Sequence, residues 1–117
     1  MSPRTLEDIR RRLEEFARAR DWEQFHTPKN LAMALIVEAG ELVERFQWLT
    51  AEESRALSPE QRDAVEQEMA DVLLYLVQLA DRLGIDLLAA ADRKIAINEG
   101  KYPADAVRGR ATKYRPS

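Results

Sequence analysis

Residues 31–48 read LAMALIVEAGELVERFQW, and residues 65–83 read VEQEMADVLLYLVQLADRL. In both stretches, apolar residues recur every three or four positions, which is the period of an amphipathic α-helix. Both are also apolar around much of their circumference: over residues 69–80 only two side chains are strongly polar. A helix of this kind is buried on more than one side. We therefore expect an all-α protein whose two central helices pack together and also meet a second copy of the chain, in a homodimer or homotetramer.

Helix start and stop signals on either side of these stretches predict a bundle of four helices. The predicted helices span residues 5–20, 27–48, 58–83 and 86–99, and residues 49–58 are predicted to be a loop. The predicted N-cap residues are Thr5, Thr27, Ser58 and Asp86. Pro28 is well placed at a first helical position, and Gln61 can complete a capping box with Ser58. Gly84 and Gly100 are expected to end the third and fourth helices.

Length and composition indicate a single domain over residues 1–117 with ordinary globular composition. The chain contains no cysteine, which excludes a disulfide scaffold and is compatible with a cytoplasmic location. No leader peptide or membrane-spanning stretch is recognisable, so we expect no membrane partner. Residues 93–117 carry seven basic and two acidic side chains, and residues 101–117 form a basic C-terminal tail without apolar periodicity. Such a tail suits a phosphate ligand, although a solvated basic end is the simpler reading of charge alone.

Two pairs of acids lie beside the apolar stripes of the central helices: Glu38-x-x-Glu41 and Glu68-x-x-Asp71. Residues three apart project from the same side of a helix. On a helical wheel, Glu38 falls inside the stripe that starts at Leu31, where an unpaired carboxylate costs several kcal/mol. Two such helices packed antiparallel would bring four carboxylates into one pocket. A cation between the carboxylates would make this arrangement tolerable.

Four hard oxygen donors without sulfur select Mg²⁺, or else Mn²⁺, and Mg²⁺ in turn favours phosphate chemistry. Acidic pairs are also common on exposed helix faces, and one pair alone would be read in that way. A rival hypothesis is a non-catalytic helical oligomerisation module whose acids form salt bridges. Arg45 is the basic residue near the Glu38 stripe that such a module could use. Glu44 is expected to be solvated or to support the ligands.

The acidic motifs Glu38-Ala-Gly-Glu41-Leu-Val-Glu44 and Glu68-Met-Ala-Asp71-Val-Leu-Leu-Tyr75 resemble those of the all-α nucleoside triphosphate pyrophosphatases, the MazG-like superfamily. The likeness covers residues 5 to 115 and is closer to the dCTP pyrophosphatase branch. That branch is suggested by Thr5-Leu-Glu-Asp-Ile-Arg10, Arg20-Asp-Trp-Glu-Gln-Phe-His26, Pro28-x-Asn30-Leu31, Phe46-Gln-Trp48, Asn98 with Lys101-Tyr102-Pro103, Arg108-Gly109 and Lys113-Tyr114. One departure is Val37, where the superfamily often carries an additional glutamate.

The resemblance implies a site that can be assigned residue by residue. Its magnesium ligands would be Glu38, Glu41, Glu68 and Asp71, with Glu41 as our choice for the residue that orients or deprotonates the attacking water. Its base pocket would have Trp22 and Trp48 as walls, with His26 nearby. Its phosphate or nucleoside contacts would be Lys94, Asn98 and Tyr102, which are spaced by four. From the residues alone, a tryptophan is more often a core residue, although the charged connector around Trp22 favours a pocket wall, and His26 is more often a capping or packing residue. Lys94, Asn98 and Tyr102 could equally form a solvated face.

The predicted activity is hydrolysis of the α–β phosphoanhydride of dCTP or a modified dCTP to the monophosphate and pyrophosphate. Alternatives are a broad-specificity or dUTP-type nucleotide pyrophosphatase and, less favoured, the oligomerisation module. Nucleic acid is not an expected partner, because residues 1–92 are net acidic and no recognition motif is present.

Overall fold

The structure is a computed structural model that describes residues 2–111 and 113. Helices are the only regular secondary structure over these residues, which confirms the predicted all-α class. The chain divides into two compact units, residues 1–84 and 85–117. The remaining residues of the predicted basic tail, 112 and 114–117, lie outside the described part. None of the described helices is both long and apolar enough to cross a membrane.

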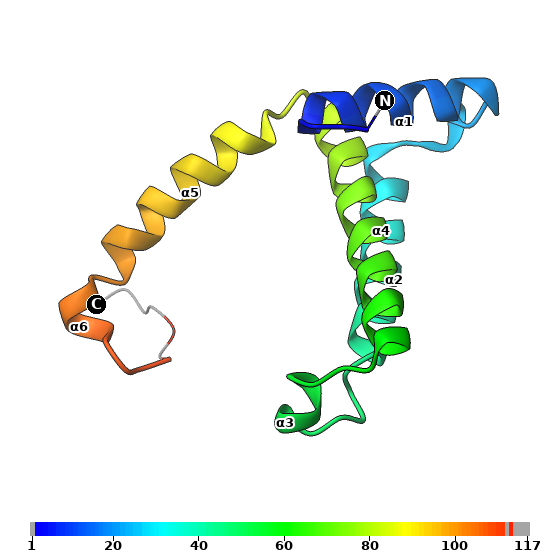
Figure 1. The fold of residues 1–117 in the computed structure, drawn as a ribbon. Coiled ribbons are helices and arrows are strands. Elements are labelled where there is room, and N and C mark those ends of the chain that lie inside the picture. Colours follow the sequence, from blue (N-terminus) through cyan, green and yellow to red (C-terminus); the bar gives the residue numbers. More distant parts are fainter. Residues whose placement is uncertain (1, 112, 114–117) are drawn as a thin grey trace. The chain divides into compact units, whose positions relative to one another are not determined.

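The first unit is built on two long antiparallel helices, α2 (Pro28–Glu44) and α4 (Pro59–Leu83). Helix α1 (Leu6–Ala19) packs across the C-terminal end of α4. The 3₁₀ turn η1 (Glu23–Phe25) leads from α1 to α2. Figure 1 shows this crossed arrangement, with α2 and α4 side by side and α1 across them. The buried apolar residues of the unit are Ala17, Leu31, Val65, Val77 and Ala80. Three of them belong to α4, which contacts both α1 and α2, and the other two come one from each of these helices.

Side-chain capping fixes where the long helices begin, as predicted. The hydroxyls of Thr5, Thr27 and Ser58 and the carboxylate of Asp86 each accept a hydrogen bond from the backbone N–H three residues on. At α4 the capping box is complete, because the Gln61 side chain accepts a 2.9 Å hydrogen bond from the Ser58 N–H. Gly84 ends α4 in the left-handed conformation, with φ of 65°.

Three details of the predicted boundaries are wrong. The segment expected to be a loop contains a short helix, α3 (Ala51–Ser54), which has its own capping box between Thr50 and Glu53. Helix α2 ends at Glu44, and residues 45–48 continue as turns rather than as helix.

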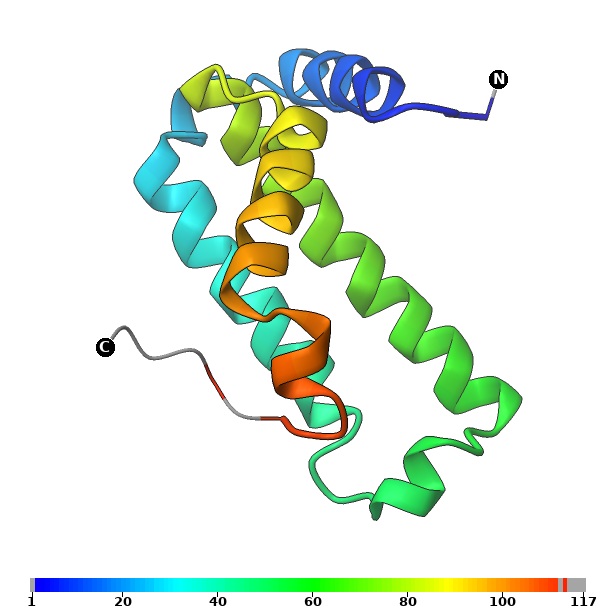
Figure 2. The ribbon, with the colours of Figure 1, turned by 90° about the vertical axis from the view of Figure 1, so that its left-hand side faces the viewer.

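The third wrong boundary lies in the second unit, which holds α5 (Leu87–Lys101) and the short α6 (Ala104–Val107), visible as orange and yellow ribbon in Figure 2. The prediction ended the fourth helix at Glu99 and Gly100, but α5 continues through Gly100 to Lys101. An interior glycine weakens a helix by only about 1 kcal/mol, so it does not have to stop one. Pro103, which cannot continue the hydrogen-bond pattern, follows directly after the C-cap residue Tyr102.

The two glycines therefore predict opposite responses to alanine. Gly84→Ala is expected to destabilise the protein by about 1 kcal/mol, because an L side chain is strained at positive φ. Gly100→Ala is expected to stabilise α5 by about 0.5 kcal/mol, because the helix is already formed there and, among the described residues, the added Cβ meets nothing within 4 Å beyond its own stretch of helix. Urea denaturation followed by helical circular dichroism measures both changes. A destabilised Gly100→Ala variant would contradict the helical role of that position.

Large apolar side chains remain uncovered on both central helices. On α2, Ile36 and Val37 are more than half exposed, and on α4 so are Met69 and Leu83, which lie in the apolar stretch 65–83. This stretch of α4 is thus covered only in part within the first unit. Such uncovered apolar surface is characteristic of interaction sites, and self-association through it remains a prediction.

Candidate metal centre and adjoining groove

Three of the four predicted metal ligands lie together. One carboxylate oxygen from each of Glu38, Glu41 and Glu68 lies within 4.8 Å of the other two. Glu38 and Glu41 project from one side of α2 because they are three residues apart, and Glu68 faces them from the antiparallel α4. Glu68 is buried with 9% of its surface exposed, Glu38 is half-buried and Glu41 is exposed. The cluster therefore runs from the helix interface to the surface.

Two oxygens of this cluster are buried without a hydrogen-bond partner: Oε2 of Glu38 and Oε2 of Glu68. A buried acceptor left unpaired costs about 1–3 kcal/mol, and more when it is charged. Burial of two such oxygens beside a third carboxylate is unfavourable unless something positive binds between them. An oxygen-only donor set of this kind fits a hard divalent cation.

The crowding of like charges also changes the acidity of Glu41. Its carboxyl hydrogen-bonds to the Glu38 carboxylate and is repelled by it, and Glu68 adds a smaller effect of the same kind. Together these neighbours raise the pKa of Glu41 to about 7. Without a cation, one proton is therefore retained at the cluster well above the pH at which a glutamate normally ionises.

This raised pKa predicts how metal-free stability depends on pH. The folded protein binds this proton more tightly than the unfolded chain does, because the pKa of Glu41 is about 7 when folded and 4.5 when unfolded. The stabilisation from the bound proton is therefore complete below pH 4.5 and is lost as the pH rises toward about 7. In chelator, the Tm of the protein is expected to fall from pH 5 to pH 7.5 relative to that of Glu41→Gln. Added Mg²⁺ should cancel this relative loss. Parallel Tm profiles for the two proteins in chelator would contradict the shared proton.

Arg45 forms an ion pair with the cluster. Its Nη2 lies 3.3 Å from Oε1 of Glu68. The sequence placed Arg45 near the Glu38 stripe, but its partner is on the neighbouring helix. This pair offsets part of the negative charge and leaves the other oxygen of Glu68 unpaired.

Asp71, the fourth predicted ligand, is not among the three clustered acids. It lies one helical turn beyond Glu68 on α4, is half-buried, and lines a groove between α1 and α4. Its role as a metal ligand therefore stays a prediction.

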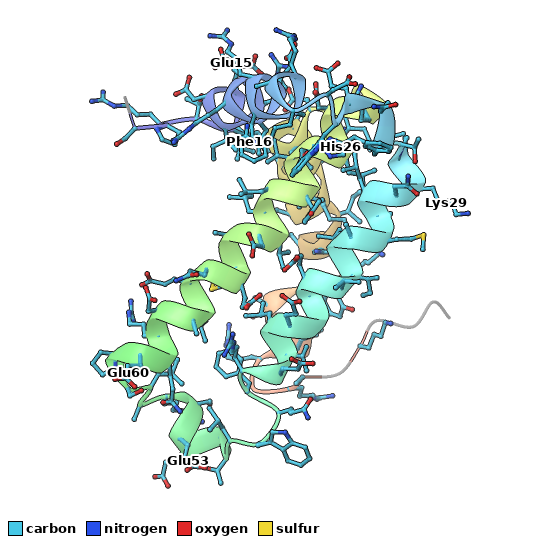
Figure 3. All side chains as sticks on the ribbon, turned by 90° about the vertical axis from the view of Figure 1, so that its right-hand side faces the viewer. Glu15, Phe16, His26, Lys29, Glu53 and Glu60 are labelled. Atoms are coloured by element: carbon cyan, nitrogen blue, oxygen red, sulfur yellow. The ribbon has the colours of Figure 1, made fainter. Side chains whose placement is uncertain are left out.

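The groove has a volume of about 610 Å³ and a mostly apolar lining, which is adequate for a nucleotide base. Two predicted base-pocket residues, Trp22 and His26, line it together with Asp71. Figure 3 shows Phe16 on the side of α1 that faces the α2–α4 pair, whereas Glu15 points away, and places His26 between the tops of α2 and α4. The groove is also lined by Tyr75, the last residue of the second acidic motif, and by Arg12 and Gln78, which the sequence analysis did not single out. No motif marks Arg12 and Gln78, because their proximity depends on how α1 crosses α4.

Aromatic packing holds the wall of this groove. The Phe16 and Trp22 rings meet edge to face at 5.7 Å, and the Arg20 guanidinium stacks 3.6 Å over the Phe16 ring. Trp22 is nevertheless 45% exposed, so part of its surface remains available for a ligand. Burial, reinforced by Arg82, lowers the pKa of His26, which favours the neutral imidazole.

A second cavity of about 370 Å³ lies on the other side of His26. Its charged lining is largely satisfied internally, because Arg10 pairs with Glu14 at 2.7 Å and with Asp81 at 3.5 Å. The groove with Trp22 is therefore the better candidate for a base.

The second predicted base wall lies elsewhere in the unit. Trp48 follows the C-terminal end of α2 and is 84% exposed, whereas Trp22 precedes its N-terminal end. A helix of 17 residues is roughly 25 Å long, which exceeds the reach of one nucleotide base. The two tryptophans of one chain therefore do not stack on the same base.

The predicted phosphate contacts belong to the second unit. Lys94 and Asn98 are exposed on α5, and Tyr102 is its C-cap residue, whose backbone N–H donates a 2.8 Å hydrogen bond to the Asn98 carbonyl. The helix extends far enough for the three residues to follow one another along its C-terminal half. Their contact with a nucleotide remains a prediction.

Known proteins resemble this chain in both sequence and fold. Residues 33–115 match the MazG-like family. The chain is 52% identical to dCTP pyrophosphatase 1 of Homo sapiens and 51% identical to that of Mus musculus, in each case over 94% of this chain and 66% of the relative. It thus spans just under two thirds of the length of these relatives. A crystal structure of a pyrophosphatase from Archaeoglobus fulgidus superposes with a TM-score of 0.80 at 39% identity, covering 88% of this chain and 96% of that one.

Proposed function

This chain belongs to the MazG-like family, and from that premise we propose that it is a nucleotide pyrophosphatase. Its proposed reaction is hydrolysis of the bond between the α- and β-phosphates of dCTP or a modified dCTP, giving the monophosphate and pyrophosphate. The observation that carries this proposal is the pair of buried, unpartnered oxygens of Glu38 and Glu68 beside Glu41. The substrate follows from the mammalian relatives that are named for dCTP.

The cluster would hold Mg²⁺, with Mn²⁺ as the second choice, through Glu38, Glu41 and Glu68. Asp71, one turn along α4, would be the fourth ligand and would connect the metal site to the groove. The ion would neutralise phosphate charge, polarise the reacting phosphorus and lower the pKa of a bound water.

Glu41 is the residue proposed to orient or deprotonate the attacking water. It is the most exposed of the three clustered acids, so its carboxylate is the one best able to reach a water at the surface of the site. Glu38 and Glu68, which are less exposed, would remain fixed as ligands.

Base recognition is assigned to the groove between α1 and α4. Trp22 would stack on the base, and His26 would lie against its polar edge. Lys94, Asn98 and Tyr102 would contact the phosphates or the nucleoside.

We propose further that the active form is a homodimer or homotetramer. Burying the exposed apolar residues of α2 and α4 against a second copy would stabilise such an assembly. A second copy could also bring its Trp48 to the groove that holds Trp22, so that each base would lie between tryptophans of two chains.

A substrate panel tests the proposed function. With Mg²⁺, the full chain is expected to release pyrophosphate rather than orthophosphate from dCTP, and to do so faster than from dUTP or dGTP. Equal rates on all nucleotides would favour a broad-specificity enzyme. A preference for dUTP would change the proposed substrate from dCTP to dUTP.

The second candidate is a non-catalytic oligomerisation module, which the ion pair of Arg45 and Glu68 favours. Isothermal titration with Mg²⁺ separates the two. The enzyme should show a saturable site that Glu38→Gln removes, whereas a salt-bridged module should show none.

A further inference from the structure

Arg45 has a position that the proposed function does not use. It is the C-cap residue of α2, one helical turn beyond Glu41, and it reaches across to α4 to contact Glu68. The Arg45 side chain is 49% exposed, whereas that of Glu68 is 12% exposed. The guanidinium therefore approaches the buried carboxylate from the solvent side.

The contact between the two residues is weak for a charge-assisted hydrogen bond. It consists of a single 3.3 Å contact from Nη2 to Oε1, longer than the 2.7–2.9 Å typical of such bonds, and not the two-pronged arrangement of a strong arginine–carboxylate pair. The other oxygen of Glu68 stays buried without a partner and belongs to the same cluster of acids. Arg45 thus partly neutralises Glu68 without filling the space between the carboxylates.

We propose that Arg45 is an exchangeable counter-cation of the acidic cluster, which stabilises Glu68 in the metal-free protein and is displaced when a divalent ion binds. The inference rests on the proposed function in one respect, that the cluster binds such an ion. A guanidinium beside a divalent cation is repelled by it, and a carboxylate that already shares its charge is a weaker ligand. Arg45 therefore lowers metal affinity while it supports the metal-free fold.

The test compares Arg45→Leu, Arg45→Gln and Arg45→Lys in the full chain. Leucine retains part of the apolar stem of arginine, and lysine retains the charge. Isothermal titration with Mn²⁺ and Mg²⁺ measures affinity, and thermal denaturation in chelator measures metal-free stability. We expect both neutral variants to bind the ion more tightly, by up to about fivefold, the size of effect that a partly exposed ion pair can have. We expect their metal-free Tm to be lower, and Arg45→Lys to stay close to the wild type in both measurements.

Arg62→Leu is the matched control, because it breaks an exposed ion pair with Glu66 on the surface of α4. It should leave metal affinity unchanged. Unchanged or weaker binding by Arg45→Gln, with a wild type that binds the ion, would overturn the role of Arg45 and leave the proposed function intact. Absence of a saturable site in the wild type and in every Arg45 variant would overturn both.

Discussion

Glu38→Gln is expected to lower kcat/KM for dCTP hydrolysis by roughly 1,000-fold or more, with the fold retained. The loss follows if Glu38 is a ligand, because the ion is assigned several kcal/mol of transition-state stabilisation and each 1.4 kcal/mol is a factor of ten in rate. Glutamine has the same shape but a weaker, neutral oxygen donor. It also relieves the repulsion between Glu38 and Glu41, so metal-free stability should stay the same or rise.

Steady-state pyrophosphate release, Mg²⁺ titration and thermal denaturation in chelator measure the three effects on one protein sample. Glu44→Gln is the matched control, since Glu44 lies on the same helix, is exposed and is not among the clustered acids. It should keep near-normal turnover. Normal activity in Glu38→Gln would contradict the proposal that the acidic cluster binds the catalytic metal ion.

Such a variant can be designed from sequence because the helix period alone places Glu38 in an apolar stripe. The same reasoning located Glu41 and Glu68, and the structure brings all three together. A helical wheel treats each helix separately, so it cannot show which side chain of one helix contacts which side chain of the neighbouring helix. For that reason Arg45 was recognised as a nearby charge, but its partner Glu68 was not.

The starts of the four predicted helices agree with the structure because a capping side chain specifies each of them. Ser58 and Gly84 define the two ends of α4 through local hydrogen bonds and a left-handed backbone, and both are legible in the sequence. The predicted end of the fourth helix at Gly100 was wrong because glycine can either end a helix or be tolerated inside one. The short helix α3 was missed although Thr50 and Glu53 carry the capping-box spacing.

The residues that line the groove between α1 and α4 were harder to predict, because the local sequence pattern does not show which residues of different helices come together. Trp22 and His26 were predicted from resemblance, whereas Arg12 and Gln78 come from two different helices that carry no shared motif. Their proximity depends on the angle at which α1 crosses α4, and that angle is set by packing at residues such as Ala17 and Val77.

Trp22→Ala is expected to raise KM for dCTP by about 5- to 140-fold, because base stacking on an aromatic residue is worth about 1–3 kcal/mol. Turnover at saturating substrate should fall less, since the metal ligands are unchanged. Phe25→Ala is the matched control: Phe25 lies in the same connector and is exposed, but it is not part of the groove lining. If Trp22→Ala has the same KM as the wild type, the base does not stack on Trp22 and must bind elsewhere on the protein.

The positions of the two tryptophans make a stronger test possible. If each base lies between Trp22 of one chain and Trp48 of another, Trp22→Ala and Trp48→Ala should be similarly impaired. Co-refolding the two variants would then form hybrid dimers in which one of the two sites has both tryptophans intact. With random mixing, half of the dimers are hybrid, so roughly a quarter of all sites should regain wild-type KM. Recovery of a low-KM fraction requires a site shared between chains, because two variants defective within single chains cannot repair each other by association.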